Sequence, residues 1–91
     1  DYDAASLAEI FRRKAAGENF TMSPEAESAM VNRFVELYEN RTQNFGNARE
    51  VNNVFQKVKE RQSQRIIDMM MKGGRPSPAD LLSFTPEDFA F

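Results

Sequence analysis

Apolar side chains in this chain recur at helical spacing, in three long stretches separated by turn-forming residues. In the first stretch, Leu7, Ile10, Phe11 and Ala15 follow an i, i+3, i+4, i+8 pattern, which places them on one face of a helix. No stretch of strand length alternates apolar and polar residues with period two, as a half-buried strand would. The pattern therefore predicts an all-α fold, a small bundle of three amphipathic helices with a short fourth helix near the C-terminus.

Capping and breaking residues set the expected bounds of these helices. Ser23 precedes Pro24, which is the usual order of an N-cap and a first-turn proline. Asn47 stands three residues before Glu50 in the pattern of a capping box, and two glycines at 73–74 end the third stretch. We expect helices over about 3–16, 24–39, 47–71 and 85–90, a stiff loop over 75–78, and one domain covering 1–91.

The composition excludes several kinds of chemistry. The 91 residues include no cysteine and no histidine, so disulfides, thiolate nucleophiles and a histidine general base are excluded, and we expect no metal site. The sequence has no apolar run of about 18 residues and no secretory leader pattern. We therefore expect a cytoplasmic protein that neither crosses nor binds a membrane. Because the chain opens without methionine, we also expect it to be part of a longer protein.

Charge is concentrated in the third predicted helix. Residues 46–75 carry seven basic and three acidic side chains, a net of +4, whereas the whole chain carries −2. A surface that binds nucleic acid is more uniformly basic and carries stacking aromatic residues. Lys57, Lys59, Arg61 and Lys72 alternate with acidic residues instead. We therefore interpret them as a solvated helix face and expect no nucleic-acid partner.

Arg49 is the charged residue of this helix that suggests a more specific role. At about 100° per residue, it points away from the apolar sector that contains Val51, Val54 and Phe55. It also lies in the first turn, where free N–H groups and the helix dipole favour an anion. A guanidinium there is suited to phosphate oxygens. The alternative is that Arg49 is an ordinary surface cation.

Three short segments of the sequence together resemble those of a known protein family. They are the residues Leu7–Phe11 (LAEIF), Ser23–Ala26 (SPEA) and, most specifically, Phe45–Asn53 (FGNAREVNN). With them the chain resembles, over nearly its whole length, the C-terminal small domain, or lid, of AAA+ ATPases. The similarity is to the CbbX/CfxQ group, which includes red-type Rubisco activases, stage V sporulation protein K-like proteins and ATPases of type VII secretion.

The resemblance implies a role in nucleotide binding for four residues. Arg49 matches the sensor 2 arginine, which reaches the γ-phosphate of ATP held by the large domain. Gly46 and Asn47 would set the helix N-terminus that faces the phosphates, and Ile10 is a weaker candidate for contact with adenine, since it also fits a plain core residue. The implied cofactor is ATP, with Mg bound by the large domain. Because the 91 residues contain no phosphate loop and no catalytic acid, we expect no enzyme activity from them alone.

The resemblance also implies partners. These are the large AAA+ domain of the same chain, neighbouring subunits of a ring that we expect to be a hexamer, and a protein substrate that ATP hydrolysis remodels. Met69, Met70 and Met71 either touch a neighbouring subunit or pack beneath residues 81–84. The alternative function is a free-standing helical protein-interaction module that uses no nucleotide.

Overall fold

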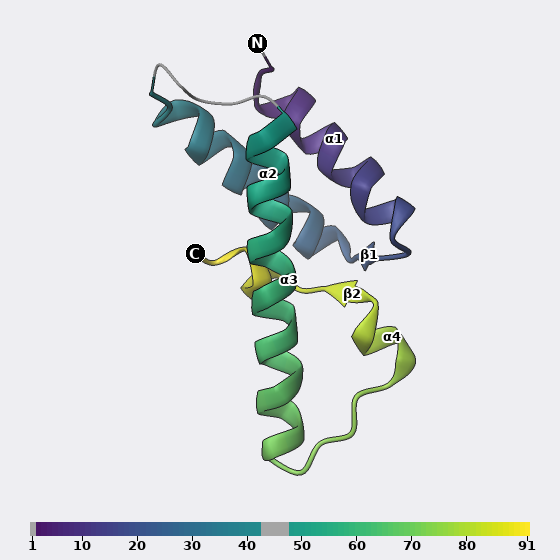
Figure 1. The fold of residues 1–91 in the computed structure, drawn as a ribbon. Helices are drawn as coiled ribbons and strands as arrows, with labels where there is room; N and C mark the ends of the chain where they lie inside the picture. Colours follow the sequence, from purple (N-terminus) through teal and green to yellow (C-terminus); the bar gives the residue numbers. More distant parts are fainter. Residues whose placement is uncertain (1, 43–47) are drawn as a thin grey trace.

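The computed structural model describes residues 2–42 and 48–91. In these ranges the helices are α1 (Ala4–Gly17), α2 (Pro24–Glu39), α3 (Ala48–Met71) and α4 (Pro78–Leu81), the strands are β1 (Thr21–Met22) and β2 (Ser83–Phe84), and the 3-10 helix η1 spans Pro86–Phe89. Figure 1 shows α1 and α2 beside the N-terminal half of α3, whose C-terminal half extends beyond them. The domain is accordingly elongated, with extents of 46 × 22 × 20 Å. The mainly helical fold confirms the predicted class.

The first two helices begin where their capping residues predict. The side chain of Asp3 accepts a hydrogen bond from the N–H of Ser6 at 2.8 Å, and that of Ser23 accepts one from Ala26 at 3.1 Å. Each bond satisfies a backbone donor that has no partner within its helix. As a result α2 has the expected bounds, and α1 is displaced by one residue from the expected 3–16. The predicted cap at Asn47 lies outside the described residues.

The region after α3 contains structure that the sequence pattern did not predict. Residues 75–77 form a loop as expected, but Ser77 and Asp80 form a capping box that begins the unpredicted helix α4 at Pro78. The strands β1 and β2 then pair in parallel, with Thr21 opposite Ser83 and Met22 opposite Phe84. Strands of two residues are too short to show a period, which is why the pattern missed them. The expected helix at 85–90 is the shorter 3-10 helix η1.

The core is built around the aromatic ring of Phe11. This side chain is fully buried, and its ring centroid lies 5.4 Å from that of Phe55 on α3 and 5.9 Å from that of Phe34 on α2. The rings of Phe84 and Phe89 approach it from the C-terminal segment at 6.1 and 5.6 Å. Most of these pairs meet edge to face, the arrangement that aromatic quadrupoles favour. Phe11 therefore joins all three long helices to the end of the chain.

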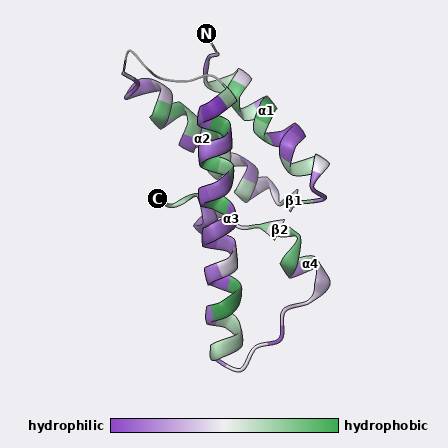
Figure 2. Cartoon of the chain, viewed as in Figure 1, coloured by the Kyte–Doolittle hydropathy of each residue, from purple (hydrophilic) through white to green (hydrophobic). Residues whose placement is uncertain are grey.

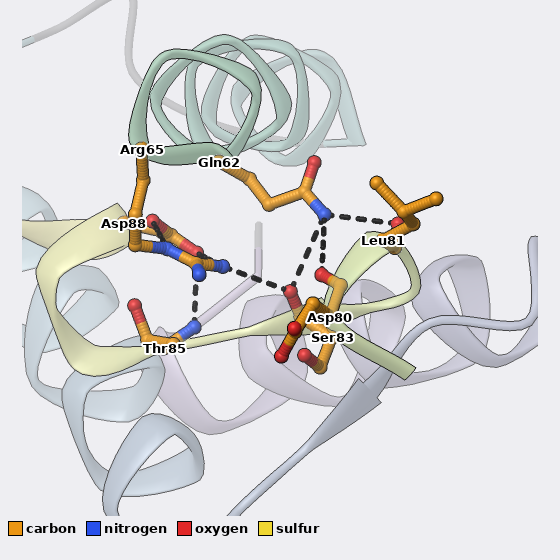
Figure 3. A network of polar contacts seen from close by, with 7 residues as sticks. All are labelled: Gln62, Arg65, Asp80, Leu81, Ser83, Thr85 and Asp88. Carbon is orange, nitrogen blue, oxygen red and sulfur yellow. Dashed lines mark hydrogen bonds and ion pairs between the residues drawn. The ribbon is translucent and has the colours of Figure 1, made fainter. Parts of the chain in front are cut away.

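A buried polar network ties the C-terminal segment to α3 (Figure 3). Arg65 of α3 donates from Nε to Asp88 Oδ1 at 3.0 Å and from Nη2 to Asp88 Oδ2 at 3.2 Å. The second carboxylate oxygen also accepts from the N–H of Thr85 at 2.9 Å, and Arg65 Nη2 donates to the carbonyl of Ser83 at 3.2 Å. Asp88 is only 1% exposed, so its charge depends on these donors.

Gln62 extends this network by one turn of α3. Its side-chain amide, in a residue that is only 6% exposed, donates to the carbonyl oxygens of Leu81 at 2.9 Å and Asp80 at 3.3 Å. These carbonyls belong to α4, which is too short to satisfy all of its own backbone groups. Gln62 and Arg65 together therefore hold α4, β2 and η1 against the middle of α3.

We predict that Arg65→Met lowers the free energy of unfolding by about 3–5 kcal/mol, because it leaves the Asp88 carboxylate buried without its cation. Urea denaturation of the 91-residue chain measures the change. The matched control is Arg13→Ala, which removes an arginine whose side chain is 80% exposed and pairs with Glu9 of the same helix; the stability of this variant should be nearly unchanged. Equal losses in both variants would contradict the role of the buried pair.

We predict that Phe11→Ala lowers the free energy of unfolding by about 3–5 kcal/mol, because the substitution leaves a cavity where several buried rings meet. Phe91→Ala is the comparison, since Phe91 is only partly buried and covers the guanidinium of Arg33 at 4.9 Å. In thermal and urea unfolding, the Phe11→Ala variant should be much less stable than the Phe91→Ala variant. The reverse ranking would show that the core is centred elsewhere.

Candidate functional site

The structure places Arg49 in the first turn of α3, on its exposed side. Arg49 is the second residue of the helix and is exposed, whereas Val51, two residues later, is fully buried. Two residues along a helix turn the side chain by about 200°. Because Val51 faces the core, Arg49 faces away from it, as the sequence predicted. Its guanidinium is thus presented at the surface by a helix end that the core holds in place.

Of the three residues predicted to act beside Arg49, the structure describes only Ile10. Gly46 and Asn47 lie outside the described residues. Ile10 is partly buried on α1 and packs against the core cluster. Its contacts therefore fit the plain core interpretation, with part of the side chain still accessible. The described part of the predicted site is thus the exposed Arg49 on α3 together with the partly accessible Ile10 on α1.

The charged face of α3 borders a groove of about 640 Å³ beside η1. Its lining includes Lys57, Arg61 and Lys72, but also Glu60, Glu87 and the Arg65–Asp88 pair described above. Positive and negative side chains thus alternate along it. The groove therefore lacks the single sign of charge that would concentrate phosphates or nucleic acid.

Lys59 departs from the expectation of a fully solvated basic face. Its ammonium lies 3.5 Å from the carboxylate of Glu18 and 4.9 Å from the ring centroid of Phe55. Lys59 therefore joins α3 to the end of α1 through a half-buried ion pair and a cation–π contact. No local pattern in the sequence predicts this contact, because Glu18 lies 41 positions from Lys59 in a different segment.

The far end of α3 carries exposed apolar side chains. Met71 is 81% exposed and Met70 is 49% exposed, while Ile67, Leu81 and Leu82 are each between 43% and 50% exposed. Figure 2 shows hydrophobic positions on the last turns of α3, in the part of the helix that extends beyond α1 and α2. Met70 and Met71 are thus exposed, whereas Met69 is partly buried. The alternative, in which the methionines pack beneath residues 81–84, does not fit Met71, because its side chain is 81% exposed.

The shifted pKa values of the described chain lie on α1 and have structural causes. The hydrogen bond from Ser6 lowers the pKa of Asp3 at the helix cap. The bond to Glu27 of α2 raises the pKa of the Arg12 guanidinium, and bonds from Arg13 and Arg12 lower the pKa of Glu9. Asp3 caps α1, and Arg12 joins α1 to α2 through Glu27. The causes of these pKa shifts are therefore structural contacts, and they do not point to a catalytic site.

Comparison with known proteins identifies the family. Residues 3–91 match the family model described as the AAA lid domain. Protein CfxQ of Xanthobacter flavus is 37% identical over 91 residues, a match that covers 97% of this chain and 26% of CfxQ. The chain thus spans about a quarter of the length of this relative. None of the described helices is long and apolar enough to cross a membrane. The chain belongs to the AAA lid domain family and is similar in sequence to CfxQ.

Proposed function

We propose that this chain is the nucleotide-responsive lid of a larger, cytoplasmic AAA+ ATPase, in which Arg49 acts as sensor 2. The observation that carries the proposal is the exposure of Arg49 at the start of a helix whose next apolar residue, Val51, is fully buried. Membership of the AAA lid domain family supports it. The buried side chains fix the helix end, so the guanidinium has a defined position relative to the domain.

The proposed chemistry follows from the properties of arginine and of a helix N-terminus. The guanidinium offers a planar set of donors that binds two phosphate oxygens at once. The positive end of the α3 dipole adds to the attraction. In the proposal Arg49 binds the γ-phosphate of ATP, while Gly46 and Asn47 shape the adjacent turn and Ile10 contacts the adenine. The large domain holds Mg and supplies the phosphate loop and catalytic acids, so the lid alone hydrolyses nothing.

The lid responds to hydrolysis because Arg49 binds the triphosphate better than the diphosphate. Loss of the γ-phosphate removes its main ligand and shifts the lid toward a second orientation. The aromatic core and the Arg65–Asp88 pair join α3 to the rest of the domain, so the domain turns as one body. From Arg49 to Met71 the helix spans 22 residues, or about 33 Å at 1.5 Å per residue. A rotation at the nucleotide therefore displaces the far end of α3.

We assign the exposed end of α3 to contact with a neighbouring subunit of a ring, which we expect to be a hexamer. Met70 and Met71 are apolar and adaptable, and they lie at the end of the helix farthest from Arg49. In the proposal ATP hydrolysis in one subunit thereby moves the next subunit, and the assembled ring remodels a protein substrate.

The second candidate function is a helical interaction module without nucleotide. The exposed apolar side chains at 67, 70, 71, 81 and 82 favour it, because such surfaces often bind proteins. In this case Arg49 is a surface cation and no phosphate contact forms. The two functions therefore differ in what happens when Arg49 is replaced.

We predict that Arg49→Ala in the full-length protein lowers ATP turnover by about tenfold or more, equivalent to at least about 1.4 kcal/mol of lost transition-state stabilisation. Arg49→Lys should fall between wild type and Arg49→Ala, because it keeps the charge but loses the paired donors. The matched control is Arg61→Ala, an exposed arginine in the middle of the same helix, which should keep wild-type turnover.

Two further measurements make the result specific. Nucleotide binding, followed with a fluorescent ATP analogue, and assembly, followed by sedimentation, separate a lost phosphate contact from a failure to bind or assemble. Wild-type turnover and nucleotide affinity in Arg49→Ala would rule out the sensor role. A full-length protein without ATPase activity would favour the interaction module.

A further inference from the structure

The three consecutive methionines at the end of α3 differ sharply in exposure. Met71 is 81% exposed, Met70 is 49% exposed and Met69 is partly buried, whereas Met30 in the core is fully buried. Met69 is covered by the chain that follows the helix: a Cβ added at Gly74 would lie 2.7 Å from its Cγ. The same short segment thus holds two exposed methionines next to one that is packed.

Accessibility matters because a thioether reacts with peroxides directly. A lone pair of the sulfur attacks one peroxide oxygen and forms an S–O bond while the O–O bond breaks. The sulfur is oxidised to the sulfoxide, and hydrogen peroxide is reduced to water. The reaction needs a free approach to the sulfur, and methionine sulfoxide reductases reverse it. Met70 and Met71 meet that requirement, and Met30 does not.

Oxidation changes the character of this surface. The sulfoxide oxygen is a strong hydrogen-bond acceptor, so burying it against apolar groups carries a desolvation penalty that the thioether does not. An apolar helix end therefore becomes a polar one when the two sulfurs are oxidised.

We propose that Met70 and Met71 form a site of reversible oxidation by peroxides, and that their oxidation weakens the subunit contact made by the far end of α3. The oxidation site stands on the exposures alone. The effect on assembly rests on the proposed function, which assigns this helix end to a neighbouring subunit. Peroxide would then control how much of the protein is assembled.

The first experiment maps the reaction in the full-length protein with hydrogen peroxide, below the concentration at which it assembles. Samples are quenched over time, digested and analysed by mass spectrometry. Met71 should oxidise fastest, followed by Met70 and then Met69, with Met30 at least about tenfold slower than Met71. Oxidation of Met30 or Met69 at the rate of Met71 would overturn the site.

The second experiment measures assembly by sedimentation velocity, comparing the wild type with the double variant Met70→Leu/Met71→Leu, which keeps an apolar surface but has no sulfur to oxidise there. Peroxide should raise the midpoint concentration for wild-type assembly by at least about threefold and leave the double variant unchanged. Treatment with a methionine sulfoxide reductase should restore the wild type. If the untreated protein does not assemble, or if peroxide affects both proteins equally, then oxidation of Met70 and Met71 does not control assembly and the proposal is overturned.

These readouts are independent of the test of Arg49. The mass shift and the sedimentation midpoint do not depend on ATP turnover, so unchanged turnover in Arg49→Ala rules out the sensor role and leaves the oxidation site intact. Conversely, an unreactive Met71 removes the oxidation site and leaves the assignment of Arg49 untouched.

Discussion

The buried ion pair between Arg65 and Asp88 is the interaction on which the segment after α3, residues 72–91, depends. The elements after α3 are a four-residue helix, a two-residue strand and a 3-10 helix, and none is long enough to be stable by itself. Arg65 supplies charged donors to Asp88 and to the carbonyl of Ser83, and the carboxylate in turn accepts the N–H of Thr85. A middle turn of α3 therefore organises a segment that local propensity would leave irregular, and so brings Phe84 and Phe89 to Phe11.

This attachment divides α3 into two parts with different surroundings. Up to about Ile66 the helix is held by the core, and beyond it the exposed residues Ile67, Met70 and Met71 belong to a projecting end. The fixed part begins with the turn that carries Arg49. A helix that is anchored along most of its length and projects only at its end is suited to transmit a small rotation over a long distance, because a helix bends little. The proposed coupling of nucleotide to neighbouring subunit uses this mechanical property.

The sequence predicted those features that depend on local pattern. Ser23 before Pro24 located the start of α2, and the 100° spacing placed Arg49 on the outer side of α3 and Val51 on the inner side. The features it missed depend on partners far away in the chain. Thr21 pairs with Ser83, which lies 62 positions later in the chain, and Arg65 binds Asp88, which lies 23 positions later. A charge count cannot reveal such a pair, since Arg65 has the same sequence signature as its solvated neighbours.

The same reasoning explains why the candidate site is harder to predict than the fold. A core residue is recognised because apolar residues recur at helical spacing. Arg49 is a single exposed cation, and its role depends on the group that it contacts. Arg49 stands in the first turn of α3, at a helix N-terminus, where a cation is locally unfavourable. An anion bound at that end would turn this unfavourable placement into a favourable one, because the helix dipole and the guanidinium would then attract the same ligand.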